Sequence, residues 1–159
     1  MQLELTQRAA YAIRAVLYLA RSDGAIVPST HIAEAMAIPS RFLPQVMGDL
    51  VRAQIVEARV GRSGGYRLRR APQTVSMLDV IDAVEADPRR TRCVLLGVAC
   101  SRASTCDVHA VFAAAQEAML AALSAASIGD VPAADESRND RVKRHCRAGR
   151  HGATLEAVV

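Results

Sequence analysis

Three of the four cysteines and one of the four histidines lie within one short segment near the middle of the chain. In CVLLGVACSRASTCDVH, the residues Cys93, Cys100, Cys106 and His109 follow the spacing C-x6-C-x5-C-x2-H. The thiolate is the form of cysteine that binds metals, and a bound metal keeps it ionised at neutral pH. We therefore interpret this segment as a metal site.

The spacing of the three cysteines and the histidine is compatible with more than one kind of metal site. It departs from the paired C-x2-C knuckles of a zinc ribbon, and its longer gaps suit a wider loop around a polynuclear cluster, while zinc held by three cysteines and a histidine also fits. A nucleophile–base pair of Cys106 and His109 is disfavoured, because no orienting acid or oxyanion-hole motif accompanies it. Buried thiols that act as small hydrophobic groups are the structural alternative. We interpret the separate pair His145 and Cys146, near the C-terminus, as incidental.

Arginines between residues 59 and 70 point to a second chemistry. This stretch holds five arginines and no acid: Arg59, Arg62, Arg67, Arg69 and Arg70. Duplex DNA is a dense line of negative charge, and arginines that displace its counterions supply most of the sequence-independent affinity. We therefore predict a DNA-binding surface here, and the alternative is a solvated basic surface without a partner.

The elements that must position these arginines begin with three predicted helices. Apolar residues recur at helical spacing in QRAAYAIRAVLYLA, HIAEAMA and RFLPQVMGDLVRA. The predicted capping residues are Thr6 for the first helix, Ser29 or Thr30 for the second and Ser40 for the third. Two short helices joined by a tight turn are typical of a helix-turn-helix.

Two strand-like runs, IVEARV and YRLRR, flank the glycine-rich tip GRSGG and predict a β-hairpin. A hairpin directly after such helices is the wing of a winged-helix domain. The second helix of a helix-turn-helix enters the major groove by its N-terminal residues, so we expect Arg41 to reach a guanine and Gln45 an adenine. The predicted DNA-binding residues are Ser40, Arg41, Gln45, Arg59, Arg62, Ser63, Gly64, Gly65 and Tyr66.

Two further helices complete a fold that is mainly α with a small β-hairpin. SMLDVIDAVEA is predicted as a helix capped by Ser76, and residues 107–126 carry a long amphipathic pattern. The apolar stripe of the long helix is rich in small residues, which suits close packing against another helix.

The overall composition excludes several protein classes. The 159 residues carry a net charge of +4, are 51% hydrophobic and only 3% aromatic. Arginines interrupt the N-terminal apolar stretch at Arg8, Arg14 and Arg21, which excludes a signal peptide and a membrane span. Without an export signal we expect a cytoplasmic protein with reduced thiols, and four cysteines are too few for a disulfide scaffold of this length.

The order of these motifs resembles the Rrf2 family of bacterial winged-helix regulators over about residues 1–130. The resemblance implies a homodimer on double-stranded DNA, with the long helix crossing its counterpart. It also implies that Cys93, Cys100 and Cys106 bind an iron–sulfur cluster. We expect a winged helix-turn-helix domain over 1–92, a cysteine cluster-binding loop over 93–106, a dimerisation helix over 107–130 and, where periodic apolar positions are lacking, a flexible tail over 131–159.

The fourth cluster ligand varies within the family. In nitric-oxide sensors of the family it can be an acid in the first helix, supplied by the partner subunit, at the position of Ala10 here. In the iron–sulfur cluster regulators it is a histidine three residues after the last cysteine, where His109 stands. The resemblance therefore favours a [2Fe–2S] cluster held by three cysteines and His109, with [4Fe–4S] as the alternative. Pro44 replaces a base-contacting glutamate of those regulators, so we expect a different operator sequence.

These observations predict a DNA-binding transcriptional regulator and not an enzyme. We expect a repressor that senses redox state, nitric oxide or iron through the cluster. A metal-free thiol switch and a zinc-bound winged-helix regulator are the alternatives.

Overall fold

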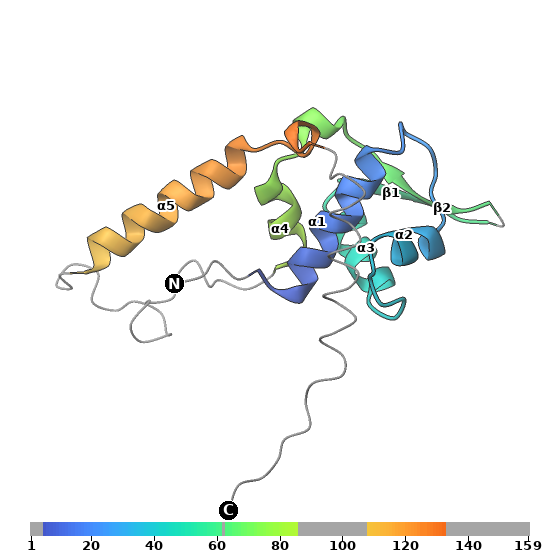
Figure 1. Ribbon diagram of the computed structural model, residues 1–159, viewed down its shortest axis with the longest axis horizontal. Coiled ribbons are helices and arrows are strands. Elements are labelled where there is room, and N and C mark those ends of the chain that lie inside the picture. The colour runs from blue at the N-terminus through green and yellow to red at the C-terminus, as the bar shows by residue number, and fades with distance from the viewer. Residues whose placement is uncertain (1–4, 62, 86–107, 133–159) are drawn as a thin grey trace, which may run out of the picture.

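The computed structural model describes residues 5–61, 63–85 and 108–132, and the chain folds as a small helical body with two projections (Figure 1). The predicted fold class, mainly α with a small hairpin, is confirmed. The elements are α1 (Gln7–Ala20), α2 (Ser29–Ala35), α3 (Leu43–Arg52), β1 (Val56–Arg59), β2 (Gly65–Leu68), η1 (Pro72–Thr74), α4 (Met77–Val84), α5 (His109–Ala125) and η3 (Ile128–Asp130). The predicted cysteine loop and all but the first two residues of the predicted tail lie outside the described residues.

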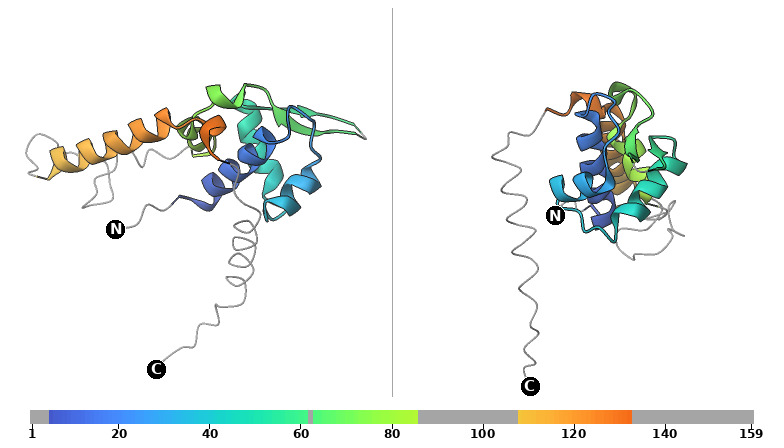
Figure 2. Two further views of the ribbon diagram at one scale, coloured as in Figure 1. Left: turned by 45° about the horizontal axis from the view of Figure 1, so that its top comes forward. Right: turned by 90° about the vertical axis from the view of Figure 1, so that its right-hand side faces the viewer.

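The body consists of α1 to α4, with the hairpin projecting from one end and α5 extending from the other (Figures 1 and 2). Its core is aliphatic, as the low aromatic content requires, and α3 contributes Met47 and Leu50, both 0% exposed. The buried side of α1 consists largely of alanines, which let the neighbouring helices approach closely. Burying a side chain the size of leucine stabilises the fold by about 1.5–3 kcal/mol.

Two predicted helix caps are confirmed. The Thr6 hydroxyl accepts a hydrogen bond from the Ala9 amide at 3.1 Å and begins α1. Ser76 and Asp79 form a reciprocal capping box at the start of α4, with both hydrogen bonds at 3.0 Å. Both motifs satisfy amide groups that a helix leaves unpaired in its first turn.

The caps predicted for α2 and α3 are wrong. Helix α2 begins at Ser29 itself, and Pro28 precedes it without a side-chain cap. Helix α3 begins at Leu43, because the carbonyl of Pro39 accepts from the Phe42 amide at 2.9 Å and makes a separate turn before the helix. Ser40 therefore lies in that turn, where its hydroxyl makes no capping bond to α3.

The hairpin pairs β1 with β2 in antiparallel register, from Val56 opposite Leu68 to Arg59 opposite Gly65. A third extended residue, which the sequence pattern did not reveal, joins it: Val27 and Tyr66 exchange two backbone hydrogen bonds of 2.9 Å. The wing is therefore fastened to the loop before α2.

Helix α5 has the predicted position but is attached to the body at its C-terminal end. The Met77 amide donates to Ala126 and the Ile128 amide to Val75, at 2.9 and 2.8 Å. Ile128 follows the helix in η3 and is only 2% exposed, so it belongs to the core of the body. Within the described ranges, no helix is both long and apolar enough to cross a membrane.

Candidate nucleic-acid interface

The predicted DNA-binding residues of the helix-turn-helix lie together at the start of α3. Ser40, Arg41 and Gln45 are exposed, whereas Leu43 and Val46 on the other side of the same turn are buried. Pro44 occupies the first turn, where its missing amide hydrogen costs no helical hydrogen bond. One side of α3 is thus held by the core and the other is free to enter a groove.

Arg41 is the cation nearest the start of α3. Its guanidinium carbon lies 4.7 Å from the centre of the Phe42 ring. In the part of the chain that the structure describes, no carboxylate forms an ion pair with Arg41. Its charge is therefore available to a DNA base or phosphate.

The arginines of the wing divide into paired and unpaired ones. Arg67 forms an ion pair with Glu57, its direct cross-strand neighbour. Arg70 donates to the Thr74 carbonyl and lies 3.7 Å from the carboxylate of Asp79. The stretch 59–70 contains no acid, as the sequence shows, but the fold supplies acids from outside it.

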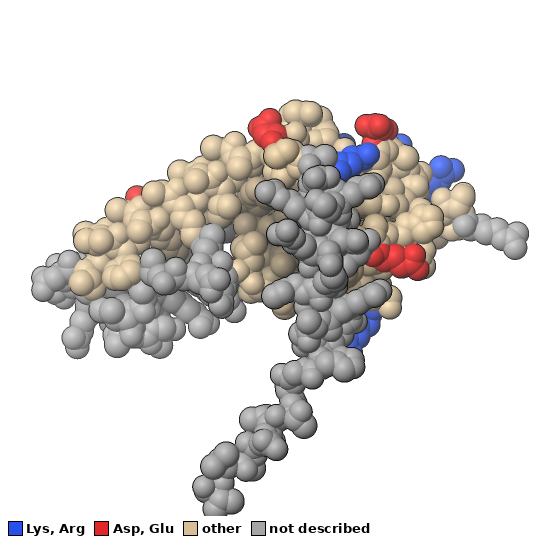
Figure 3. Space-filling model, in the orientation of Figure 1, with Lys and Arg blue, Asp and Glu red and all other residues tan. Residues whose placement is uncertain are grey.

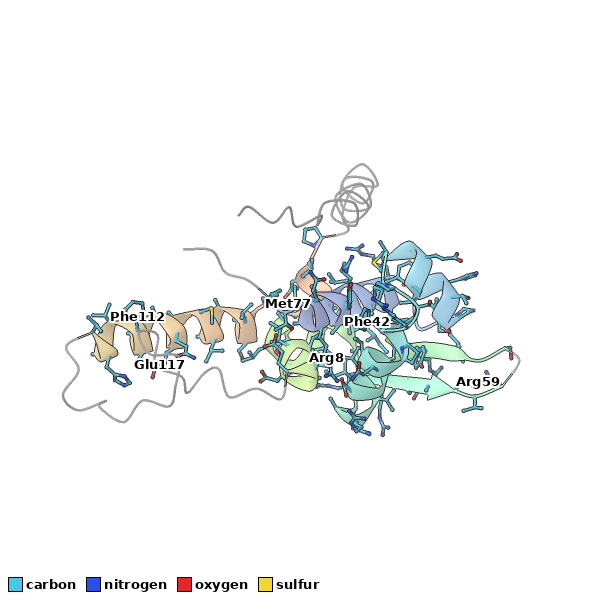
Figure 4. All side chains as sticks on the ribbon, turned by 90° about the horizontal axis from the view of Figure 1, so that it is seen from below. Arg8, Phe42, Arg59, Met77, Phe112 and Glu117 are labelled. Atoms are coloured by element: carbon cyan, nitrogen blue, oxygen red, sulfur yellow. The ribbon has the colours of Figure 1, made fainter. Side chains whose placement is uncertain are left out.

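Arg59 and Arg69 are exposed and have no ion pair with any described carboxylate. Arg59 extends from the hairpin, away from the body (Figure 4). Arg62 lies outside the described residues, and Ser63 is exposed at the tip. Among the described arginines of the predicted surface, Arg41, Arg59 and Arg69 are therefore the ones without an ion pair.

Three further predicted wing residues, Gly64, Gly65 and Tyr66, also make contacts that stabilise the fold. A Cβ atom on Gly65 would lie 2.2 Å from the Val27 carbonyl oxygen, and one on Gly64 would lie 2.4 Å from the Arg59 carbonyl oxygen. Tyr66 is half-buried and packs against the core. Glycine is therefore required at both positions by close backbone contacts.

Asp49 is a residue whose role the sequence reasoning missed. It is 4% exposed, the one buried charged residue in the described ranges, and it lies on the side of α3 that faces α1. Arg8 of α1 and Arg52 of α3 both form ion pairs with its carboxylate. A buried charge without partners is strongly unfavourable, so this cluster ties the two helices together. Only the spacing of Asp49 and Arg52 was visible as a local signal.

Arg14 also acts inside the fold. Its Nη1 donates to the Met36 carbonyl at 2.8 Å, and its Nε donates to the Ala10 carbonyl at 3.3 Å. Its guanidinium also lies 5.0 Å from the centre of the Tyr11 ring. This arginine therefore joins α1 to the end of α2.

Of the four predicted metal ligands, the structure describes only His109. It is the first residue of α5, at the end of the helix that is remote from the body (Figure 1). Cys93, Cys100 and Cys106 lie outside the described residues. Among the residues that are described, no group of three or more His, Cys, Asp or Glu side chains comes close enough to hold a metal.

Comparisons with known proteins agree with this architecture. The sequence model of the Rrf2 family, described as an iron-dependent transcriptional regulator, matches residues 5–134. Rv1287 of Mycobacterium tuberculosis, a candidate HTH-type transcriptional regulator, is 29% identical over 161 residues, covering 94% of this chain and 99% of the relative. The HTH-type transcriptional regulator IscR of Escherichia coli is 26% identical over 157 residues, covering 98% and 96% respectively.

Solved structures show the same fold at lower identity. The global cysteine regulator CymR of B. subtilis has a TM-score of 0.67 at 18% identity, and the match covers 81% of this chain and 95% of that one. IscR of T. potens has a TM-score of 0.65 at 20% identity, with 100% and 96% covered. The winged helix-turn-helix and the long helix are thus a recurrent arrangement.

Proposed function

The chain belongs to the Rrf2 family of transcriptional regulators, which are not enzymes, and we propose that it binds a specific double-stranded DNA operator. We further propose that it does so as a cytoplasmic homodimer and that it senses its signal through an iron–sulfur cluster. The observation that carries the DNA contact is the start of α3, where Arg41 and Gln45 are exposed over a buried apolar side. This is the part of a helix-turn-helix that reads base edges.

Base contacts and phosphate contacts would come from different parts of this surface. Arg41 offers a planar fork of donors that fits the O6 and N7 acceptors of guanine, and Gln45 offers the amide that pairs with adenine. The unpaired Arg59 and Arg69 of the wing supply phosphate contacts, which add affinity without sequence preference. Arg67 and Arg70 contribute less, because Glu57 and Asp79 already balance their charge.

The homodimer is supported by the surface of α5. None of its 17 residues is buried, although its only acidic residue is Glu117 and it has no arginine or lysine. Val111 is 69% exposed. Figure 3 shows α5 as an almost uncharged surface on the face in view. An exposed apolar surface of this kind marks an interface, and the alanines along it allow a second helix to approach closely.

The cluster is supported by the chemistry of its donors and by the family to which the chain belongs. Cys93, Cys100, Cys106 and His109 provide three thiolates and an imidazole, a set that fits an iron–sulfur cluster. When bound, such a cluster supplies sensitivity to oxidation, nitric oxide and iron supply. The thiolates hold it, and His109 places a ligand on the first residue of α5. The state of the ligands is thereby linked to the helix that sets the spacing of two recognition helices.

The decisive experiment for the cluster is anaerobic purification followed by an absorption spectrum and analysis of iron, acid-labile sulfide and zinc. We expect a coloured protein that contains iron and sulfide, and loss of both in Cys100→Ala. A colourless protein with stoichiometric zinc would establish the zinc-bound alternative. A metal-free protein that forms a disulfide on mild oxidation, detected by mass spectrometry, would establish the thiol switch.

The DNA contact is tested on an operator selected from a random pool of duplexes by the wild-type protein. We expect Arg41→Ala to weaken operator binding by about 1–3 kcal/mol and to relax the base preference at one position. Arg21→Ala is the matched control, because Arg21 is an exposed arginine that donates to the Pro132 carbonyl on another part of the surface. Equal effects of the two substitutions would refute the assigned contact.

A further inference from the structure

Four side chains form a continuous stack that connects α1 to the turn before α3. The guanidinium of Arg14 lies 5.0 Å from the centre of the Tyr11 ring. The Tyr11 and Phe42 rings lie 6.1 Å apart at an interplanar angle of 29°. The guanidinium of Arg41 lies 4.7 Å from the centre of the Phe42 ring. Two cations thus flank two aromatic rings, an arrangement that the ring quadrupoles favour.

The inner end of this stack is fixed to the body. Arg14 is held by hydrogen bonds to the carbonyls of Ala10 on α1 and of Met36, the residue directly after α2. Tyr11 stands on α1 between Ala9 and Ala12, residues that are 0% exposed. The position of the Tyr11 ring is therefore set by the core.

The outer end has little other support. Phe42 is 38% exposed and precedes α3 as an N-cap residue without a side-chain hydrogen bond. Phe42 also lines an open pocket of about 270 Å³ together with Arg8, Gln45 and Val46. In Figure 4, Phe42 and Arg8 are both labelled on the body, far from α5. The ring contact with Tyr11, rather than burial in the core, determines where Phe42 lies.

We propose that Phe42 is a positioning residue for DNA recognition: stacked on Tyr11, it holds the guanidinium of Arg41 in the orientation that reads a base. This rests on the proposed function. Arg41 lies in the turn before α3, so helical geometry does not direct its side chain. Stacking occupies one face of the guanidinium and leaves the donors at its edge free, and guanine is recognised by those donors. A side chain that is already restricted loses less conformational freedom when it binds.

The test is a double-mutant cycle of Arg41→Ala and Phe42→Leu, measured by fluorescence anisotropy on the selected operator and on an unrelated duplex. We expect Phe42→Leu to weaken operator binding about two- to fivefold while Arg41 is present. We expect no further loss when Phe42→Leu is added to Arg41→Ala. Binding to the unrelated duplex should not change, because Phe42→Leu removes no charge. Phe42→Tyr keeps a ring and should retain wild-type operator binding.

A second variant and a solution measurement keep the proposal separate from effects on folding. Tyr11→Leu removes the other ring and should reproduce the effect of Phe42→Leu, with thermal unfolding used to confirm that both variants fold. In the free protein, the Arg41 side-chain NMR signals should carry a ring-current shift that Phe42→Leu abolishes. Arg21→Ala, at an exposed position on another part of the surface, is the control for a substitution outside the stack.

The outcomes distinguish the two proposals. If Phe42→Leu weakens binding equally with and without Arg41, the positioning role is overturned while the Arg41 contact stands. If Arg41→Ala leaves operator affinity unchanged, the assigned DNA contact fails, and the positioning role fails with it.

Discussion

The body of α1–α4 and the long helix α5 are both rich in apolar side chains, with opposite results. In the body, residues such as Met47 and Leu50 are fully shielded from solvent, whereas none of the 17 residues of α5 is buried. The body therefore satisfies its apolar side chains within one subunit. Helix α5 leaves an apolar surface that the rest of the described chain covers little of. Stability and association should accordingly respond to different substitutions.

The largest effect is expected in the body, from Leu50→Ala. Removing a side chain that is 0% exposed loses its burial and leaves a cavity, so the free energy of unfolding should fall by about 2–5 kcal/mol. Urea denaturation at constant protein concentration measures this change. Val60→Ala on the wing should alter stability by less than about 0.5 kcal/mol. A similarly small loss for Leu50→Ala would contradict the division between a closed body and an open helix.

The next effect is expected from Asp49→Ala, which leaves Arg8 and Arg52 without their shared carboxylate. The free energy of unfolding should fall by about 1–3 kcal/mol, less than for a fully buried pair because the Arg8 side chain is 41% exposed and that of Arg52 is 75% exposed. Urea denaturation measures the loss, and high salt should change it little, because Asp49 itself is buried. Arg52→Ala is the matched control and should cost under about 1 kcal/mol.

A substitution in α5 should weaken association of the chain rather than lower its free energy of unfolding. Val111→Glu places a charge near the remote end of α5, at a position that is 69% exposed and lies outside the core of the body. We expect the dissociation constant of the proposed dimer to rise at least about tenfold, or about 1.4 kcal/mol, as measured by sedimentation. Ser124→Glu introduces the same charge on the side of the helix that carries Glu117 and should have little effect. A dimer unaffected by Val111→Glu would move the interface away from this position.

The smallest effect is expected where the two regions meet. Ser76→Ala removes the capping bond of α4 next to the backbone bridge between Ser76 and Ser127. The expected loss of stability is about 1 kcal/mol, again measured by urea denaturation. Ser76→Asp retains a capping side chain and should restore most of that loss. If both variants lose the same amount, the capping bond does not stabilise the junction.

Features with a local signal could be predicted from the sequence. Thr6 and Ser76 stand directly before amphipathic runs, and both act as caps. The wing followed from two short runs around a glycine-rich tip. The cap predicted for α2 failed because the helix begins directly after Pro28, whose carbonyl accepts from the His31 and Ile32 amides. The cap predicted for α3 failed because the turn made by Pro39 delays α3 beyond Ser40.

Contacts between distant parts of the chain could not be predicted in this way. Nothing in the neighbourhood of Asp49 indicates that Arg8 of another helix pairs with it, and nothing near Gly65 points to Val27. The charge of the wing was overestimated for the same reason, because Asp79 comes from α4. Propensity and periodicity report on neighbours in sequence, and these interactions depend on the assembled fold.

The attachment of α5 at one end gives the helix the geometry of a lever. A helix of 17 residues is about 25 Å long, at about 1.5 Å per residue. Its fixed end lies at the bridge between Ser76 and Ser127, and its remote end carries His109. For a rigid rod of this length, a displacement of about 2 Å at His109 corresponds to a rotation of about 5° at the junction with α4. A small change at the far end would thus reach the body as an angular change beside the capped start of α4.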